Sequence, residues 1–289
     1  MNDQALYHGL DRAALDFQYN NRERVPQHAE IYAGWAPANA AVKADFETRL
    51  NVAYGDHVRE KLDIFLPKGK GPFPIRLFFH GGYWMSRDKE DSHFIVRGQV
   101  EAGAVVISCE YALIPSVGMA ELIRQCRAAV AWAWKNAASY GGDADRLYVS
   151  GHSAGGHITA MLLATDWAAW GLPADAVKGG AALSGIFDLT PMRLCYIDDT
   201  LHLTAQDVAE FSPITLAPAK GAKTLVAVGG AETQEFLRQS RAFADAWIAA
   251  GHAVELLEVP GANHFTILNH YADRGQALCR AMIRQMGLT

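Results

Sequence analysis

The sequence predicts an α/β protein in which a mostly parallel β-sheet is covered by helices on both faces. Short, continuously apolar segments alternate along the chain with longer segments whose apolar residues recur at helical spacing. Strands that alternate with helices form βαβ units, whose strands run parallel and are buried on both faces. The chain has 289 residues, 50% of them hydrophobic and 20% charged, so it can bury a full core. We therefore expect one α/β domain over residues 1–289.

The first elements differ from the rest of the chain. Residues 1–45 do not follow the alternation and read as an irregular N-terminal arm that packs on the domain. Two segments with strand-like alternation, 48–54 and 61–66, come next and are separated by a short Gly-Asp turn. Because their connection is short, we expect these two strands to be antiparallel.

The remaining elements follow from composition and spacing. The predicted strands are 75–79, 104–109, 147–150, 179–183, 224–228 and 254–259. The predicted helices are 120–135, 154–164, 234–250 and 271–286. Residues 188–218 break the alternation, because this segment is long and holds three prolines between two strands. Long connections of this kind usually form lids or binding loops, so we expect a lid-like insertion here.

Composition and charge exclude several classes of protein. The chain carries 26 Lys and Arg against 31 Asp and Glu, a net charge of −5, which argues against binding to nucleic-acid phosphates. No apolar run reaches the roughly 18 residues of a membrane span. The N-terminus shows no basic segment followed by an apolar one, so we expect no secretory signal and a cytoplasmic location. The four cysteines show no CxxC spacing and are expected to be reduced, buried thiols: Cys109, Cys126, Cys195 and Cys279.

No cofactor or metal motif is present. The sequence lacks GxGxxG, GxxxxGK[ST], HExxH and the EF-hand loop. His152 and His157 lie close together in the sequence but have no third ligand beside them. We therefore expect no cofactor and no metal.

The sequence GHSAGG at residues 151–156 is the strongest functional signal. It follows a predicted strand and precedes a predicted helix of small residues, which is the setting of a nucleophile elbow. The glycines let neighbouring backbone segments pack where a Cβ atom would clash. The helix N-terminus behind Ser153 favours negative charge that develops there during a reaction. Ser153 is thus the candidate nucleophile, and a purely structural glycine-rich turn is the alternative.

The sequence HGGYW at residues 80–84 directly follows another predicted strand. In α/β-hydrolases a backbone N–H of this loop and the N–H after the nucleophile form the oxyanion hole. The candidate donors here are the N–H groups of Gly82, Tyr83 and Ala154. We expect His80 to fix the loop through side-chain hydrogen bonds rather than to act as an acid or base.

A histidine and a carboxylate must complete the site. In α/β-hydrolases the chain order is nucleophile, acid, histidine, and His264 lies in a polar loop after the last predicted strand. Glu232 follows the strand 224–228 and is the preferred acid, which would hold the imidazole tautomer. Glu235 is an alternative, but a carboxylate in the first turn of a helix is favoured by the dipole alone and is expected to face solvent. Asp188, after the preceding strand, is the other alternative.

Together these residues resemble the arylformamidase (kynurenine formamidase) branch of the α/β-hydrolases. The similarity starts at about residue 19 and is carried by HGGYW at 80–84, GHSAGG at 151–156, SGIFDL at 184–189 and the stretch 232–240. The resemblance implies the α/β-hydrolase fold and the hydrolysis of N-formylkynurenine to formate and kynurenine, a step of tryptophan catabolism. The family usually has Asp where this chain has Glu232, so a Ser153–His264–Glu232 triad departs from the family by one methylene.

Aromatic residues near predicted strand ends indicate an apolar or aryl substrate. We expect Trp84, Phe187 and Phe265 to contact a small molecule, either an aryl formamide or a short-chain ester. The sequence does not separate a formamidase from a carboxylesterase with an unknown natural ester, and it leaves a homodimer open. A third hypothesis is a catalytically silent binding protein. The intact nucleophile, histidine and oxyanion loop argue against it.

Overall fold

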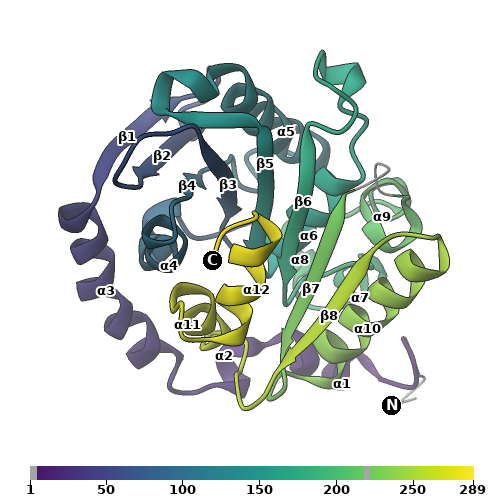
Figure 1. Ribbon diagram of the computed structural model, residues 1–289. Coiled ribbons are helices and arrows are strands. Elements are labelled where there is room, and N and C mark those ends of the chain that lie inside the picture. Colours follow the sequence, from purple (N-terminus) through teal and green to yellow (C-terminus); the bar gives the residue numbers. More distant parts are fainter. Residues whose placement is uncertain (1–4, 218–221) are drawn as a thin grey trace.

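An eight-stranded sheet forms the centre of the computed structural model, which describes residues 5–217 and 222–289 (Figure 1). The strands are β1 (Glu47–Ala53), β2 (Lys61–Leu66), β3 (Phe73–Phe79), β4 (Val105–Cys109), β5 (Gly142–His152), β6 (Val177–Leu183), β7 (Lys223–Gly229) and β8 (Val254–Val259). Their order across the sheet is β1-β2-β4-β3-β5-β6-β7-β8. Strand β2 is antiparallel to both β1 and β4, and the other neighbours are parallel. The predicted mostly parallel sheet with an antiparallel start is confirmed.

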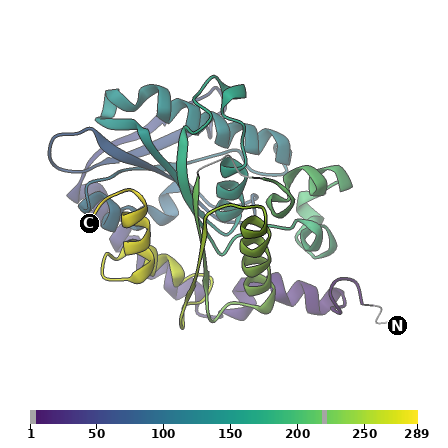
Figure 2. The ribbon, with the colours of Figure 1, turned by 45° about the vertical axis from the view of Figure 1, so that its right-hand side comes forward.

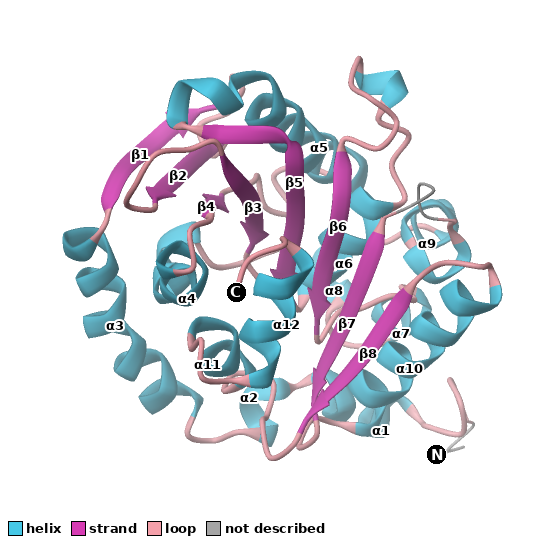
Figure 3. Cartoon of the chain, viewed as in Figure 1, coloured by secondary structure: helices cyan, strands magenta, loops and turns pink. Residues whose placement is uncertain are grey.

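The apolar strands supply a core on each face of the sheet. Successive residues of a strand point to opposite faces, so Val105 and Ile107 join one buried cluster while Val106 between them joins the other. The first cluster packs against α5 (Met119–Asn136), α6 (Ala154–Leu163) and α10 (Gln234–Ala249). The second packs against α3 (His28–Asp45), η1 (Lys89–Val96), α4 (Arg97–Glu101), α11 (Ile267–Ala272) and α12 (Ala277–Gln285). Helices therefore cover both faces of the sheet, as Figures 2 and 3 show.

The N-terminal arm is helical, so the expectation of an irregular segment was wrong. It forms α1 (Arg12–Tyr19), the short α2 (Asn21–Arg24) and α3. The Asp11 side chain accepts a hydrogen bond from Ala14 N at 2.8 Å and so begins α1. Helix α3 is rich in alanine, the strongest helix former, and buries Trp35 and Val42 against the domain. Local capping, alanine content and the packing of these two side chains together favour helices in the arm.

Two further differences concern helices near the second face of the sheet. The single closing helix expected at 271–286 is divided into α11 and α12, because Asp273 ends α11 and its carboxylate accepts from Gly275 N at 2.8 Å in a turn. The connection between β3 and β4 contains η1 and α4, which the sequence analysis did not predict. Two short 3-10 helices, η2 (Ala137–Tyr140) and η3 (Ala168–Trp170), lie outside the predicted elements.

The expected insertion at 188–218 consists of short helices up to residue 217, and its last residue lies outside the described residues. These are α7 (Thr190–Leu194), α8 (Asp198–Leu201), α9 (Ala205–Phe211) and the 3-10 helix η4 (Pro213–Thr215). In residues 5–217 and 222–289, no helix has the length and apolar character needed to span a bilayer. The four cysteines are buried and unpaired with one another.

Candidate active site

Ser153 occupies the sharp turn between β5 and α6. Its backbone has φ 59° and ψ −117°, a region that a residue other than glycine rarely adopts and that costs about 1–3 kcal/mol. A Cβ atom on Gly151 would lie 2.2 Å from the carbonyl oxygen of Gly155, and one on Gly155 would lie 1.9 Å from the carbonyl oxygen of Phe79. Only glycine at both positions lets β3, β5 and α6 approach this closely. The turn has the strained strand-to-helix geometry that the sequence predicts.

His264 and Glu232 form a buried pair beside this turn. Glu232 follows β7, His264 follows β8, and the two side chains meet with His264 Nδ1 2.6 Å from Glu232 Oε2. The other carboxylate oxygen, Oε1, accepts from Ser184 Oγ at 2.5 Å and from Gly229 N at 2.8 Å. Each carboxylate oxygen therefore has its own partners, which fixes the carboxylate against the imidazole ring.

The two alternative candidates for the catalytic acid, Glu235 and Asp188, have other partners. Glu235 pairs with Arg238 at 2.7 Å and accepts from the hydroxyl of Tyr19 at 3.0 Å. Asp188 accepts from the hydroxyl of Tyr7 at 2.7 Å and from Thr190 N. The expectation that Glu235 faces solvent was wrong, because the N-terminal arm covers it and leaves it 4% exposed. Of the three, only Glu232 contacts His264 within the described residues.

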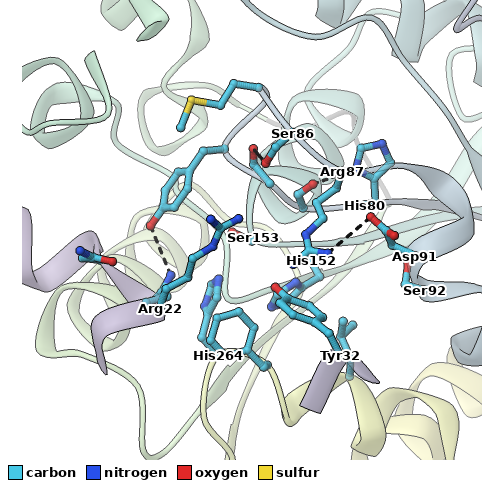
Figure 4. Close-up of a pocket in the computed structure, with 18 of the residues that line it drawn as sticks. Arg22, Tyr32, His80, Ser86, Arg87, Asp91, Ser92, His152, Ser153 and His264 are labelled. Carbon is cyan, nitrogen blue, oxygen red and sulfur yellow. Dashed lines mark hydrogen bonds and ion pairs between the residues drawn. The ribbon is translucent and has the colours of Figure 1, made fainter. Parts of the chain in front are cut away.

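Ser153 and His264 line one cavity, together with Gly82 and Tyr83 (Figure 4). No hydrogen bond joins Ser153 to His264 in the part of the chain that the structure describes. Such bonds are often long in an empty site and tighten when substrate binds. The N–H groups of Gly82, Tyr83 and Ala154 likewise donate to no other group of the described chain. Gly82 and Tyr83 therefore bring unpaired N–H groups to the cavity that Ser153 lines.

Hydrogen bonds hold His80 at the base of the HGGYW loop. Its Nε2 lies 3.0 Å from Glu110 Oε1, and its Nδ1 lies 2.7 Å from the carbonyl oxygen of Gly81. The ring stacks on Tyr111 at a centroid distance of 4.3 Å. Glu110 Oε1 also accepts a hydrogen bond from Arg59 Nη2 at 2.5 Å. These contacts anchor the loop, which is the role expected for His80.

The Glu110 carboxylate should make the folded protein sensitive to acid. Burial raises the pKa of Glu110, but its polar partners lower it more, from 4.5 to about 2. These partners are His80, through a hydrogen bond and its charge, the backbone N–H of Lys89, and the charge of Arg59. A lowered pKa stabilises the fold above pH 4.5, and this contribution, at most about 3 kcal/mol, is lost as the pH falls toward 2. We expect Glu110→Gln to lower the free energy of unfolding at pH 7 and to weaken its dependence on pH between 4.5 and 2.

Urea unfolding followed across that pH range measures this effect. Glu121→Gln is the control, because the Glu121–Arg124 pair is largely exposed and solvent screens it. Equal losses in the two variants, or an unchanged pH dependence in Glu110→Gln, would contradict the assignment.

The cavity has a volume of about 540 Å³, within the range of small-molecule sites. Its tyrosine, tryptophan and phenylalanine side chains come from the arm, from β3 and the loop after it, from the insertion and from the loop after β8: Tyr32, Trp35, Phe78, Tyr83, Tyr196 and Phe265. Phe265 thus lines the cavity, as its place after the last strand predicts. Tyr32 and Trp35 were missed, because the arm was treated as irregular.

Trp84 and Phe187 do not line this cavity, contrary to expectation. Trp84 is fully buried and donates from Nε1 to His157 Nδ1 at 3.2 Å. Phe187 is also fully buried and stacks on Phe243 at a centroid distance of 4.1 Å. Both side chains belong to the first buried cluster of the core.

The histidines around the elbow do not form a metal site in the described residues, where no group of three or more His, Cys, Asp and Glu side chains comes together. Burial lowers the pKa of His152, and the neighbouring His264 lowers it further. Burial also lowers the pKa of His157, to about 4, and its Nε2 lies 2.7 Å from the carbonyl oxygen of Phe211. Both rings are therefore neutral near pH 7.

Comparisons with known proteins show which family the chain resembles. The chain is 32% identical over 247 residues to the kynurenine formamidase of Danio rerio and 33% identical over 248 residues to that of Salmo salar, covering 83% of each chain in both cases. The model of the prolyl oligopeptidase family matches residues 122–280, and the BD-FAE model matches residues 62–169. A crystal structure described as a putative thioesterase from a Silicibacter species superposes with a TM-score of 0.80 at 29% identity, covering 92% of this chain and 97% of that one.

Proposed function

Because the chain belongs to the kynurenine formamidase family of α/β-hydrolases, we propose that it hydrolyses N-formylkynurenine to formate and kynurenine. The protein is a serine hydrolase, and the proposal concerns its substrate and the roles of its residues. One observation carries it: Ser153, His264 and the unbonded amides of the HGGYW loop line one aromatic cavity, and His264 is paired with Glu232. An aryl formamide presents a flat apolar ring to such a cavity and a small carbonyl to the serine.

The first half of the proposed reaction forms a formyl ester on Ser153. The Ser153 hydroxyl oxygen attacks the formyl carbon while His264 takes the hydroxyl proton. The carbonyl oxygen becomes negatively charged and is held by the N–H groups of Gly82, Tyr83 and Ala154. When the C–N bond breaks, His264 returns the proton to the aryl amine, which leaves as kynurenine.

The second half uses water in place of the amine. His264 takes a proton from a water molecule, whose oxygen attacks the formyl ester. The ester bond breaks, the serine oxygen regains a proton from His264, and formate leaves. Throughout, Glu232 holds the imidazole ring through Nδ1 and stabilises its positive charge.

A comparison of kcat/KM between N-formylkynurenine and a series of p-nitrophenyl esters tests the choice of substrate. We expect the formamide to exceed p-nitrophenyl acetate by at least about tenfold in kcat/KM, although its amide bond is intrinsically less reactive, because binding of the kynurenine part stabilises the transition state. A preference for the esters would instead favour a carboxylesterase, the second candidate. A relative from Mycobacterium tuberculosis that is named esterase LipC is 29% identical over 238 residues, and this similarity supports that candidate.

A further inference from the structure

A positively charged side chain without a partner lies in the cavity. Arg22, on the short helix α2, is one of the residues that line it, and Figure 4 shows its side chain reaching from the arm toward Ser153. Its guanidinium makes no ion pair or hydrogen bond with the described residues. The acidic neighbours have other partners, since Asp16 pairs with Arg12 and Glu23 accepts from Asn20.

The second guanidinium of the cavity is already engaged. Arg87 lies over the ring of Tyr32, with its Cζ 3.6 Å from the ring centroid, and its Nη1 is 3.6 Å from a carboxylate oxygen of Asp91. Asp91 is the one acidic side chain among the described residues that line the cavity. The charges of Arg87 and Asp91 offset each other, so Arg22 leaves the cavity with an unbalanced positive charge.

A carboxylate matches the geometry of such a guanidinium. The planar fork of arginine donates two parallel hydrogen bonds to a carboxylate, and charge-assisted bonds of this kind are about twice as strong as neutral ones. The Arg22 side chain is exposed, so its charge is not desolvated before a substrate arrives. An anionic substrate can therefore pair with Arg22, and keeping this unpaired charge in the protein costs little folding stability.

We infer that Arg22 binds a carboxylate on the leaving-group part of the substrate, so that the enzyme prefers aryl formamides and aryl esters that carry an acid group. The inference rests on the proposed function in one respect: a formyl group has no side chain, so any charge that the enzyme recognises must lie on the leaving amine. N-formylkynurenine carries a carboxylate there. Arg22 is in this view a specificity-determining residue that takes no part in the chemistry.

A matched pair of esters tests the charge preference independently of formamide hydrolysis. The substrates are 3-acetoxyphenylacetic acid and its primary amide, which share a reacting group and differ in charge. We expect the wild-type enzyme to favour the acid in kcat/KM. Arg22→Ala should raise KM for the acid about 10- to 100-fold, the loss expected for a charge-assisted hydrogen bond, and leave the amide within about twofold. Arg22→Lys should restore part of the preference, because it keeps the charge but not the fork.

Arg24→Ala is the matched control. Arg24 lies on the same helix, but its guanidinium packs over the ring of Phe17 at 4.9 Å, away from the cavity. This variant should retain the preference for the acid, and thermal unfolding should confirm that all variants are folded.

Two results would overturn the inference: a wild-type enzyme that hydrolyses the acid no better than the amide, or an Arg22→Ala variant that changes both substrates equally. If N-formylkynurenine is not hydrolysed while Arg22→Ala abolishes the preference between the esters, the inference about Arg22 stands and the proposed function falls.

Discussion

Replacing Ser153 by alanine is expected to remove essentially all hydrolysis of formamide and ester substrates while the protein stays folded. The loss of a nucleophilic serine from a triad reaches about 10⁶ in kcat in the best-studied hydrolase. The fold should survive because the Ser153 hydroxyl forms no hydrogen bond with the described residues. Alanine also keeps the Cβ atom that the turn already accommodates at φ 59°.

Two measurements check this expectation. Turnover at saturating substrate gives the loss of kcat, and circular dichroism shows whether the variant is folded. A fluorophosphonate probe, which reacts with activated serines, should label the wild-type protein and not Ser153→Ala. Retention of more than a thousandth of wild-type activity would exclude Ser153 as the nucleophile. Failure of the probe to label the wild-type protein would favour a catalytically silent binding protein.

The parts of the site that follow strands could be predicted from the sequence. Parallel strands buried on both faces read as continuous apolar runs, and their carboxyl ends meet at one edge of the sheet. The residues after β3, β5, β7 and β8 therefore lie along one edge of the sheet, which is why HGGYW, Ser153, Glu232 and His264 could be named as candidates from the sequence. Because β6 and β7 separate β5 from β8 in the sheet, the loop that carries His264 must also reach back across the strand ends.

The walls of the cavity could not be predicted in the same way. Tyr32, Trp35 and Arg22 lie in the arm, far from the strands in the sequence, and reach the cavity only because α2 and α3 pack on the domain. Trp84 lies one residue beyond Tyr83, yet it turns into the core. Residues 82–84 all have positive φ, and this backbone path sends neighbouring side chains in different directions. Such choices depend on tertiary packing that no local pattern records.

Replacement of Glu232 by glutamine should have the second largest effect, lowering kcat by about 10²–10⁴. In the wild-type protein Oε1 accepts from Ser184 Oγ and Gly229 N, and Oε2 faces His264 Nδ1. A glutamine would keep its carbonyl oxygen on these two donors, which leaves its NH₂ group facing the imidazole. His264 would then have to accept at Nδ1 and carry its proton on Nε2. That tautomer cannot take the proton of Ser153, and the neutral amide cannot stabilise the imidazolium.

The two other carboxylates provide the comparison that decides the acid. Asp188→Asn should keep near-normal kcat, because Asp188 bonds to Tyr7 and Thr190 rather than to His264. Glu235→Gln should also keep kcat but lower the stability of the protein, since it weakens a buried pair with Arg238. Measuring kcat and thermal unfolding for all three variants separates loss of chemistry from loss of fold. If Glu232→Gln turned over normally while Asp188→Asn or Glu235→Gln lost activity without unfolding, the acid would have to be reassigned, and the contact between Glu232 and His264 would serve only to pack the loop after β8.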